Sequence, residues 1–247
     1  MTIDIFTLLL AAASVAAGAL ASVTGFGIGS LLTPVLASSI DARVAVAAVS
    51  IPHLAGTALR FWMLKGHVDR RVFWRFGLMS AAGGLAGALL HARATSPALM
   101  VLFGALLIFV AISQVTGLAR RMRFHGPAAW VAGGTSGLLG GLVGNQGGIR
   151  SAALLGFNLR PETFVATATA IGLVVDGARM PVYFALYPRD IAALWPTIGL
   201  ATAGVLAGTF AGRPLLARIP EQWFRRMLAL VLAVLGGFML LRATAAL

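Results

Sequence analysis

Long apolar runs, separated by short connections that hold most of the charged residues, dominate the pattern of this chain. A helix needs ~20 apolar residues to cross the ~30 Å hydrocarbon core of a bilayer. Six runs come close to that length, at residues 44–64, 72–91, 98–118, 163–186, 191–212 and 224–241. Because the runs are continuous and do not alternate with period two, they predict membrane-spanning helices and argue against a transmembrane β-barrel.

Two further apolar segments have an unusual length, at residues 3–37 and 128–158. Each is too long for one ordinary crossing and too short for two comfortable ones. Glycines interrupt both segments in the middle, namely Gly25, Gly27 and Gly29 in the first and Gly144, Gly147 and Gly148 in the second. We expect each segment to form a helical hairpin. The pattern leaves open whether the hairpins are re-entrant or cross fully, which gives six or ten spans in total.

The second half of the chain repeats features of the first about 119 residues later. The matching positions are Gly25 and Gly144, Gly29 and Gly148, Arg60 and Arg179, and, after a shift of two residues, Asp69 and Asp190, Trp74 and Trp195, Gly83 and Gly204, and Gly87 and Gly208. Weak duplication with glycine-interrupted apolar segments at matching places is typical of secondary transporters. We therefore divide the membrane domain into two repeats, residues 1–123 and 124–247, each a Gly-broken hairpin followed by three transmembrane helices.

The distribution of Lys and Arg over the connections favours the hairpins. If both odd segments cross once, these residues divide nine to seven between the two sides, whereas with hairpins they divide twelve to four. The basic side then holds Lys65, Arg70, Arg71, Arg75, Arg120, Arg121, Arg123, Arg160, Arg213, Arg218, Arg225 and Arg226, and the other side holds Arg43, Arg93, Arg189 and Arg242. The positive-inside rule assigns the basic side to the cytoplasm and both termini to the periplasm. Since three crossings per repeat invert the second half, we predict an all-α polytopic membrane protein with two inverted repeats.

Composition narrows the class of protein further. The chain has 247 residues, of which 59% are hydrophobic and 11% charged, whereas soluble domains carry about a quarter charged residues. The net charge of +12 comes mostly from Arg in the connections, so it reflects membrane topology, and we expect no nucleic-acid partner. Cysteine is absent and no two histidines have metal-ligand spacing, so we expect no disulfide, no metal site and no cofactor.

The second glycine break carries the polar groups that point to a binding site. Asn145 and Gln146 supply two side-chain amides, and Arg150 follows in the first turn of the next helix. Backbone that leaves the helix at membrane depth must be buried in protein or line a polar cavity. The arm that begins at Gly147 and Gly148 presents free N–H groups and a positive dipole end, which suit an anion.

The first break supplies the matching arm, with Gly27, Gly29 and Ser30 at its start. Two helix N-termini that meet at a pseudo-symmetry axis form a site for an anion. The alternative is that the glycines only allow close helix packing. Four-residue spacing predicts this packing role for two other sets, Gly133, Gly137 and Gly141, and Gly204, Gly208 and Gly212.

Arg60 and Arg179 occupy matching positions inside predicted spans. An Arg within a span costs about 2.5–3.5 kcal/mol on insertion scales and usually faces a partner or a pathway. Asp176 lies three residues before Arg179, close enough for an ion pair. That pair is either purely structural or makes Asp176 a coupling residue that takes up a proton. Arg60 is nearer the end of its span, so extension of its side chain to the headgroups is an alternative to a role in a site.

The balance of charge within the spans indicates an anionic substrate. Arg60, Arg150 and Arg179 against Asp176 leave about two positive charges uncompensated. A guanidinium also matches the oxygens of a tetrahedral oxyanion bidentately. Thr167 and Thr169 are weaker candidates for the site, because Thr in a span often bonds only to its own helix.

One motif favours an enzyme. Residues 134–137 read Gly-Thr-Ser-Gly, the short motif of rhomboid-type intramembrane serine proteases, with Ser136 as nucleophile. The mechanism needs a base that reaches the serine hydroxyl, and in that family the histidine lies on a later helix. Here His53, His67, His91 and His125 all precede Ser136, so we expect no enzyme. His53, beside Pro52, is expected to be a packed neutral imidazole, the alternative being a residue that titrates during transport.

Three stretches resemble the TauE/SafE (sulfite exporter) family of membrane transporters, namely GFGIGSLLTP at Gly25–Pro34, GLLGGLVGNQGG at Gly137–Gly148 and FVATATA at Phe164–Ala170. The resemblance covers nearly the whole chain and implies a bacterial inner-membrane carrier for sulfite, sulfoacetate, other sulfonates or carboxylates. The sequence departs from the family pattern where Asn145 and Gln146 interrupt the glycine run, where no proline follows, and where the A-T-S stretch reads Ala168-Thr169. These departures fall on the expected site.

We therefore predict a secondary transporter that moves a small organic or inorganic anion through a site at the midplane, driven by gradients because no ATP-binding motif is present. The predicted partners are the small anion and the lipid bilayer, with a homo-oligomer as a further possibility. The alternatives are a channel or exporter for another small solute, including a cationic one, an intramembrane protease, and a membrane scaffold without transport.

Overall fold

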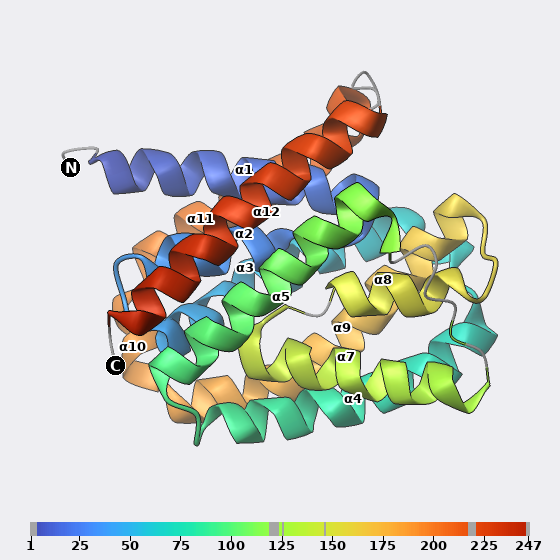
Figure 1. The fold of residues 1–247 in the computed structure, drawn as a ribbon, viewed down its shortest axis with the longest axis horizontal. Helices are drawn as coiled ribbons and strands as arrows, with labels where there is room; N and C mark the ends of the chain where they lie inside the picture. Colours follow the sequence, from blue (N-terminus) through green and yellow to red (C-terminus); the bar gives the residue numbers. More distant parts are fainter. Residues whose placement is uncertain (1–3, 119–123, 125, 146, 217–220, 246–247) are drawn as a thin grey trace.

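The computed structural model describes residues 4–118, 124, 126–145, 147–216 and 221–245, and in this part of the chain every regular element is a helix (Figure 1). The first half contains α1 (Ile5–Thr24), α2 (Ile28–Ala37), α3 (Ala42–Leu64), the short 3₁₀ helix η1 (Lys65–His67), α4 (Arg70–His91) and α5 (Ser96–Thr116). The second half contains α7 (Pro127–Val143), α8 (Gly147–Leu155), α9 (Pro161–Leu186), α10 (Pro188–Ala193), α11 (Trp195–Leu216) and α12 (Glu221–Thr244). The predicted all-α class is confirmed.

Both predicted glycine breaks are present and have the same geometry. Gly25 ends α1 with φ 79°, and Gly144 ends α7 with φ 73°, both in the left-handed region. Their N–H groups donate to Ala21 O and Gly140 O, each over 3.0 Å. Glycine accepts this conformation without the clash that a Cβ would cause, so the two residues end the helices at equivalent places. A short arm, α2 or α8, then packs back on its own longer helix.

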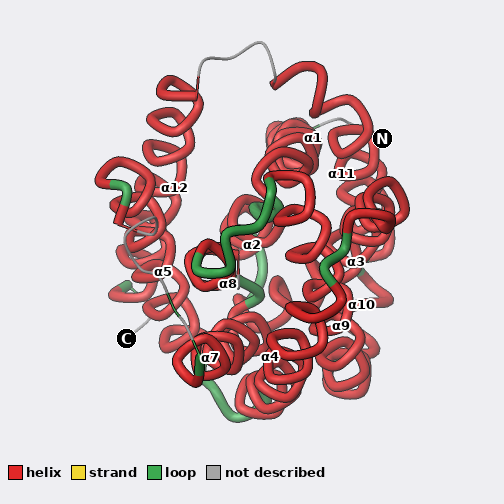
Figure 2. The backbone as a smooth tube through the Cα atoms, turned by 90° about the vertical axis from the view of Figure 1, so that its right-hand side faces the viewer, coloured by secondary structure: helices red, strands yellow, loops and turns green. Residues whose placement is uncertain are grey.

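Six helices of the described chain are long and apolar enough to cross a membrane, and the chain is a multi-pass membrane protein. They are Ile5–Thr24, Ala42–His67, Arg70–His91, Ser96–Thr116, Pro161–Leu186 and Arg226–Thr244. The first odd segment thus consists of one full-length helix, α1 with 20 residues, and one arm of half that length, α2 with 10 residues. Figure 2 shows α2 and α8 in the middle of the bundle, surrounded by the longer helices.

The prediction of one continuous helix over residues 191–212 is wrong at its start. The chain forms α10 first, breaks at Leu194 and begins α11 at Trp195. The reason is Pro196, the second residue of α11. Proline has no N–H to donate and clashes with the preceding turn, so it is tolerated only in the first turn of a helix.

Each long helix of the first half packs against a long helix of the second half. α1 packs along α11, α7 packs along α4, and α5 packs along α12, while α3 and α9 lie together in the interior. The glycines at these crossings are Gly83 and Gly87 of α4, Gly137 and Gly141 of α7, and Gly204, Gly208 and Gly212 of α11. A Cβ on any of them would overlap an atom of the facing helix. The predicted role of the four-residue glycine spacing in close packing is therefore confirmed.

The connections collect at two opposite ends of the bundle. His67 of η1 lies 3.6 Å from Glu162 at the start of α9, which brings these two connections together at one end. At the other end, Ser96 Oγ donates to Asp41 Oδ2 over 2.6 Å. In Figure 1, α1 begins and α12 ends on the left, whereas α7 begins on the right. Opposite starting ends for α1 and α7 are expected if the two halves are inverted. The inversion and the division into residues 1–123 and 124–247 both stay predictions.

Candidate functional site

The two glycine breaks meet each other in the interior. A Cβ at Gly29 would overlap the carbonyl oxygen of Gly144, so the start of α2 lies directly against the end of α7. Ser30 Oγ lies 3.3 Å from Asn145 Oδ1, and both side chains are buried. Gly147 in turn faces Phe26, whose Cβ occupies the space that a side chain would need. The structure thus brings together one arm from each half, as the sequence predicts.

The polar groups at this junction are not all satisfied. Asn145 is 7% exposed, and its Nδ2 has no hydrogen-bond partner among the described residues. Thr33 Oγ1, one turn into α2, is likewise buried without a partner in this part of the chain. A buried donor without a partner costs about 1–3 kcal/mol, so such groups are expected to serve a bound molecule or ordered water. Gln146 lies outside the described residues, and Gly148 lies in the first turn of α8.

Arg150 of α8 is almost completely buried beside the first break. Its Nη2 donates to the carbonyl oxygen of Gly25 over 3.3 Å, while Nε and Nη1 have no partner among the described residues. Nη1 lies close to Gly172 of α9, where a Cβ would come within 3.1 Å of it and within 3.4 Å of the methyl group of Thr57. The hydroxyl of Thr57 is also buried and without a described partner. The Nε and Nη1 atoms of Arg150 can therefore donate hydrogen bonds to a ligand, and the polar side chain of Thr57 lies nearby.

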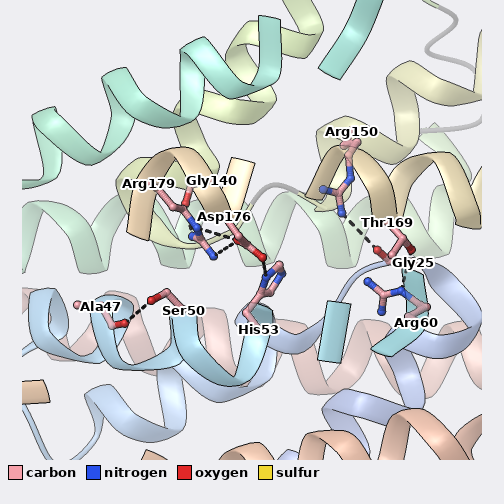
Figure 3. A network of polar contacts seen from close by, with 10 residues as sticks. All are labelled: Gly25, Ala47, Ser50, His53, Arg60, Gly140, Arg150, Thr169, Asp176 and Arg179. Atoms are coloured by element: carbon pink, nitrogen blue, oxygen red, sulfur yellow. Dashed lines mark hydrogen bonds and ion pairs between the residues drawn. The ribbon is translucent and has the colours of Figure 1, made fainter. Parts of the chain in front are cut away.

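Arg60 of α3 is 3% exposed, which disfavours the interpretation that its side chain extends to the headgroups. Its Nε donates to Thr169 Oγ1 of α9 over 2.8 Å, and its Nη1 has no partner among the described residues. Arg60 and Arg150 are close enough for their charges to repel. Figure 3 shows both guanidinium groups beside Thr169 and Gly25.

Arg179 of α9 has a different environment, because all three of its guanidinium nitrogens have protein partners. Nε and Nη2 lie 3.0 and 2.8 Å from Asp176 Oδ1, and Nη1 donates to the carbonyl oxygen of Gly140 in the last turn of α7. The other carboxylate oxygen, Asp176 Oδ2, lies 2.7 Å from Nδ1 of His53 on α3. His53, Asp176 and Arg179 form a buried polar cluster, which Figure 3 shows beside the two other arginines.

The buried charges of these helices do not balance. Arg60, Arg150 and Arg179 are between 1% and 3% exposed, and Asp176 is fully buried. With a neutral imidazole at His53, three guanidinium groups therefore face one carboxylate. Charge buried in this way is costly, and a bound anion would offset part of that cost. Among the described residues, no group of three or more His, Asp or Glu side chains could hold a metal ion.

Some candidates have other tasks in the structure. Thr167 accepts a hydrogen bond from the backbone N–H of Asp69 over 2.9 Å, so it links α9 to the start of α4. Ser136 is completely buried in α7, where the next residue packs against Ser80 of α4. The described histidines have other partners, since His53 bonds to Asp176 and His91 bonds through Nδ1 to the carbonyl oxygen of Leu142 over 2.7 Å.

Two features of the site are not evident in the sequence. The contact between His53 and Asp176 joins residues 123 positions apart, and no local pattern indicates it. Thr57 is detectable only through the internal repeat, because an offset of about 119 residues places it opposite Asp176. The first half thus has a neutral hydroxyl where the second half has the carboxylate, which explains why the positive charge collects around Arg60 and Arg150.

The sequence matches a known protein family over most of its length. A family model described as sulfite exporter TauE/SafE matches residues 10–239, which include both glycine breaks and all three buried arginines. A comparison with curated proteins and one with solved structures returned no match.

Proposed function

Since the chain belongs to the sulfite exporter TauE/SafE family and is a membrane transporter, we propose that it carries a small oxyanion, such as sulfite or a sulfonate, across the bacterial inner membrane. The family name supports the sulfur-containing class of substrate, and the charge balance of the interior supports an anion. Transport is secondary and uses a gradient. In the proposed orientation both termini lie in the periplasm.

One observation carries this proposal. Arg150 Nε, Arg150 Nη1 and Arg60 Nη1 are buried and have no hydrogen-bond partner among the described residues. Guanidinium groups retain their charge in proteins, so these N–H groups need an acceptor. A tetrahedral or pyramidal oxyanion presents several acceptors at once and brings the negative charge that the cluster lacks.

The neighbouring groups complete the proposed site. Asn145 Nδ2 and Thr57 Oγ1 are two further buried polar atoms with no partner in the described part of the chain, and Thr169 Oγ1 positions Arg60 by accepting a hydrogen bond from its Nε. The backbone N–H groups at the starts of α2 and α8, near Gly27, Gly29, Gly147 and Gly148, supply positive dipole ends. In this proposal Arg179 contributes charge but is held by Asp176 and Gly140, so it positions the end of α7 more than it binds the substrate.

Asp176 remains the proposed coupling residue, and the structure gives it a partner in His53. A proton taken up by the pair would weaken the contact between Asp176 and Arg179, and with it the connection between α9 and the end of α7. His53 faces Asp176 and Arg179 of α9 and the charge of Arg150 on α8. A dependence of transport on the proton gradient follows from this arrangement.

The test is anion binding and uptake by the purified full-length chain. In proteoliposomes we expect saturable uptake of radiolabelled sulfite or a sulfonate, and no uptake of an organic cation of similar size. Arg150→Gln and Arg60→Gln should each weaken anion binding ~10–100-fold, which corresponds to the loss of ~1.5–3 kcal/mol for a charged hydrogen bond. Arg93→Gln, an exposed residue in the connection between α4 and α5, is the matched control.

Four outcomes would overturn the proposal. Unchanged anion binding in both Arg150→Gln and Arg60→Gln would remove these residues from the site. Selective transport of a cation would favour the alternative solute, and non-saturable flux of the anion would favour a channel. Labelling by a serine-directed fluorophosphonate that disappears in Ser136→Ala would favour the protease.

A further inference from the structure

A groove opens on the surface of the bundle where α3, α4 and α9 meet, and none of the three buried arginines lines it. It is a groove of about 610 Å³ between the end of α3, η1, the start of α4 and the middle of α9. The residues that line it are Phe61, Lys65, Gly66, Val68, Arg70, Phe73, Trp74, Ala170, Leu173 and Val174. We call it the α4–α9 groove.

The α4–α9 groove is basic at one end and apolar at the other. Lys65 and Arg70, both exposed, stand at one end, where η1 connects α3 to α4. The ammonium of Lys65 lies 3.8 Å from the ring centroid of Trp62. Trp and basic side chains at a helix end mark the headgroup level of a bilayer. The opposite end, towards Leu173 and Val174 of α9, is apolar.

The positive charge at this mouth is available to a ligand. Of the two carboxylates nearby, Glu162 lies 3.6 Å from His67, and Asp69 accepts a hydrogen bond from the backbone N–H of Val72 over 2.9 Å. Neither Lys65 nor Arg70 forms an ion pair with a carboxylate of the described chain. The mouth therefore offers two cations that face outward at the headgroup level.

The depth of the groove fits one chain of a lipid. Thr167 of α9 lies at the level of the mouth, because its hydroxyl accepts a hydrogen bond from the backbone N–H of Asp69 beside Arg70, and Val174 lies seven residues further along α9, or ~10 Å at 1.5 Å per residue. Half of the hydrocarbon core is ~15 Å thick. An acyl chain that enters beside Lys65 and Arg70 would therefore follow the apolar wall over about two thirds of that thickness.

We propose that the α4–α9 groove binds an anionic phospholipid. Its phosphate contacts Lys65 and Arg70, and one acyl chain lies along Phe61, Phe73 and Val174. Anionic lipids are attracted to basic residues at the cytoplasmic surface, where the positive-inside rule places this end of the bundle. The proposal rests on the chain being a membrane protein and does not depend on the substrate. Failure of lipid binding would therefore leave the proposed anion transport untouched.

The experiment measures lipid binding to the full-length protein in a neutral detergent by native mass spectrometry and by thermal unfolding. We expect phosphatidylglycerol to bind and raise the unfolding temperature, and phosphatidylcholine to do so at least tenfold more weakly. Lys65→Gln combined with Arg70→Gln should weaken phosphatidylglycerol binding ~10–30-fold. Arg71→Gln combined with Arg75→Gln removes the same charge from exposed positions at the same end of α4 but outside the groove, and it should bind like the wild type.

A third variant separates the lipid from a free anion. Val174→Trp fills the apolar part of the groove, so it should lower phosphatidylglycerol binding and leave the charge of the mouth unchanged. Inorganic phosphate alone should produce no comparable stabilisation. Equal losses in the two double variants, equal binding of both lipids, or stabilisation by inorganic phosphate that matches that by phosphatidylglycerol would each overturn the proposal.

Discussion

Nδ1 of His53 lies 2.7 Å from Oδ2 of Asp176, and this buried contact joins α3 of the first half to α9 of the second. The second oxygen of the same carboxylate holds Nε and Nη2 of Arg179, which in turn reaches the carbonyl oxygen of Gly140. One carboxylate therefore connects α3, α9 and the end of α7 at the glycine break. A change at Asp176 is therefore expected to affect the packing of all three helices.

We expect Asp176→Asn to destabilise the protein strongly. It leaves the guanidinium of Arg179 buried without a counter-charge, and breaking one side of a buried ion pair costs about 3–5 kcal/mol. Thermal unfolding in detergent measures the loss. The double variant Asp176→Asn/Arg179→Gln removes both charges and should recover part of the stability, so a double variant that loses the sum of the two single effects would contradict the interpretation.

Thr169→Val tests how Arg60 is positioned. The substitution keeps the shape of the side chain and removes the acceptor of the hydrogen bond from Arg60 Nε. We expect the affinity for the transported anion to fall ~10-fold, since a hydrogen bond to a charged group contributes ~1.5–3 kcal/mol. Calorimetric titration with sulfite measures the change. Thr202→Val is the control, because the hydroxyl of Thr202 donates to Ile198 O of its own helix, and equal losses in both variants would argue against a specific role for Thr169.

Gly137→Ala tests the close crossing of α7 and α4. A Cβ at Gly137 would overlap the carbonyl oxygen of Ser80, whereas at Gly134, one turn earlier, the nearest atom is Met79 O at 3.9 Å. Overpacking costs about 1–3 kcal/mol, so Gly137→Ala should lower the unfolding temperature while Gly134→Ala leaves it nearly unchanged. Similar unfolding temperatures for the two variants would contradict the described crossing.

Asp41 should make the stability of the connection between α2 and α3 depend on pH. Burial alone raises the pKa of Asp41, but the hydrogen bonds from Ser96 and Arg43 outweigh it and hold the pKa below its ordinary value. A lowered pKa in the folded state contributes stability above the pKa of the unfolded chain, and this contribution is lost as the pH falls below ~4. The unfolding temperature of Asp41→Asn should therefore vary less between pH 3 and 6 than that of the wild type. Parallel pH profiles would show that Asp41 has no such role.

The features that depend on a local pattern of residues could be predicted from the sequence. Apolar length predicts the long helices, and glycine within an apolar run predicts the breaks at Gly25 and Gly144, because only that residue accepts the left-handed turn without strain. The four-residue spacing of Gly133, Gly137 and Gly141 predicts a helix crossing, although not which helix lies opposite. An arginine within a span usually faces a partner or a pathway, and Arg179 and Arg60 are both buried, although the position of Arg60 near the end of its span left contact with the headgroups as an alternative.

The remaining features depend on which helices meet, and no local pattern encodes this. Arg179 and Arg60 look equivalent in the repeat, yet Arg179 has partners for every guanidinium nitrogen and Arg60 does not. The difference arises because Asp176 has a hydroxyl, Thr57, as its counterpart in the first half. The pairing of His53 with Asp176 follows only from the packing of α3 on α9.

Because helices of the first half pack against helices of the second, the order of synthesis decides when each helix pair can form. When α7 leaves the ribosome, α4 is already in the membrane to receive it, whereas α1 must wait for α11. About 170 residues separate α1 from α11, which at ~5–20 residues per second means a delay of roughly 10–30 s. During that interval the face of α1 around Gly18, which packs on α11 in the folded protein, lies against lipid or the insertion machinery. The first half must therefore remain in the membrane without the partner of α1 until α11 is synthesised.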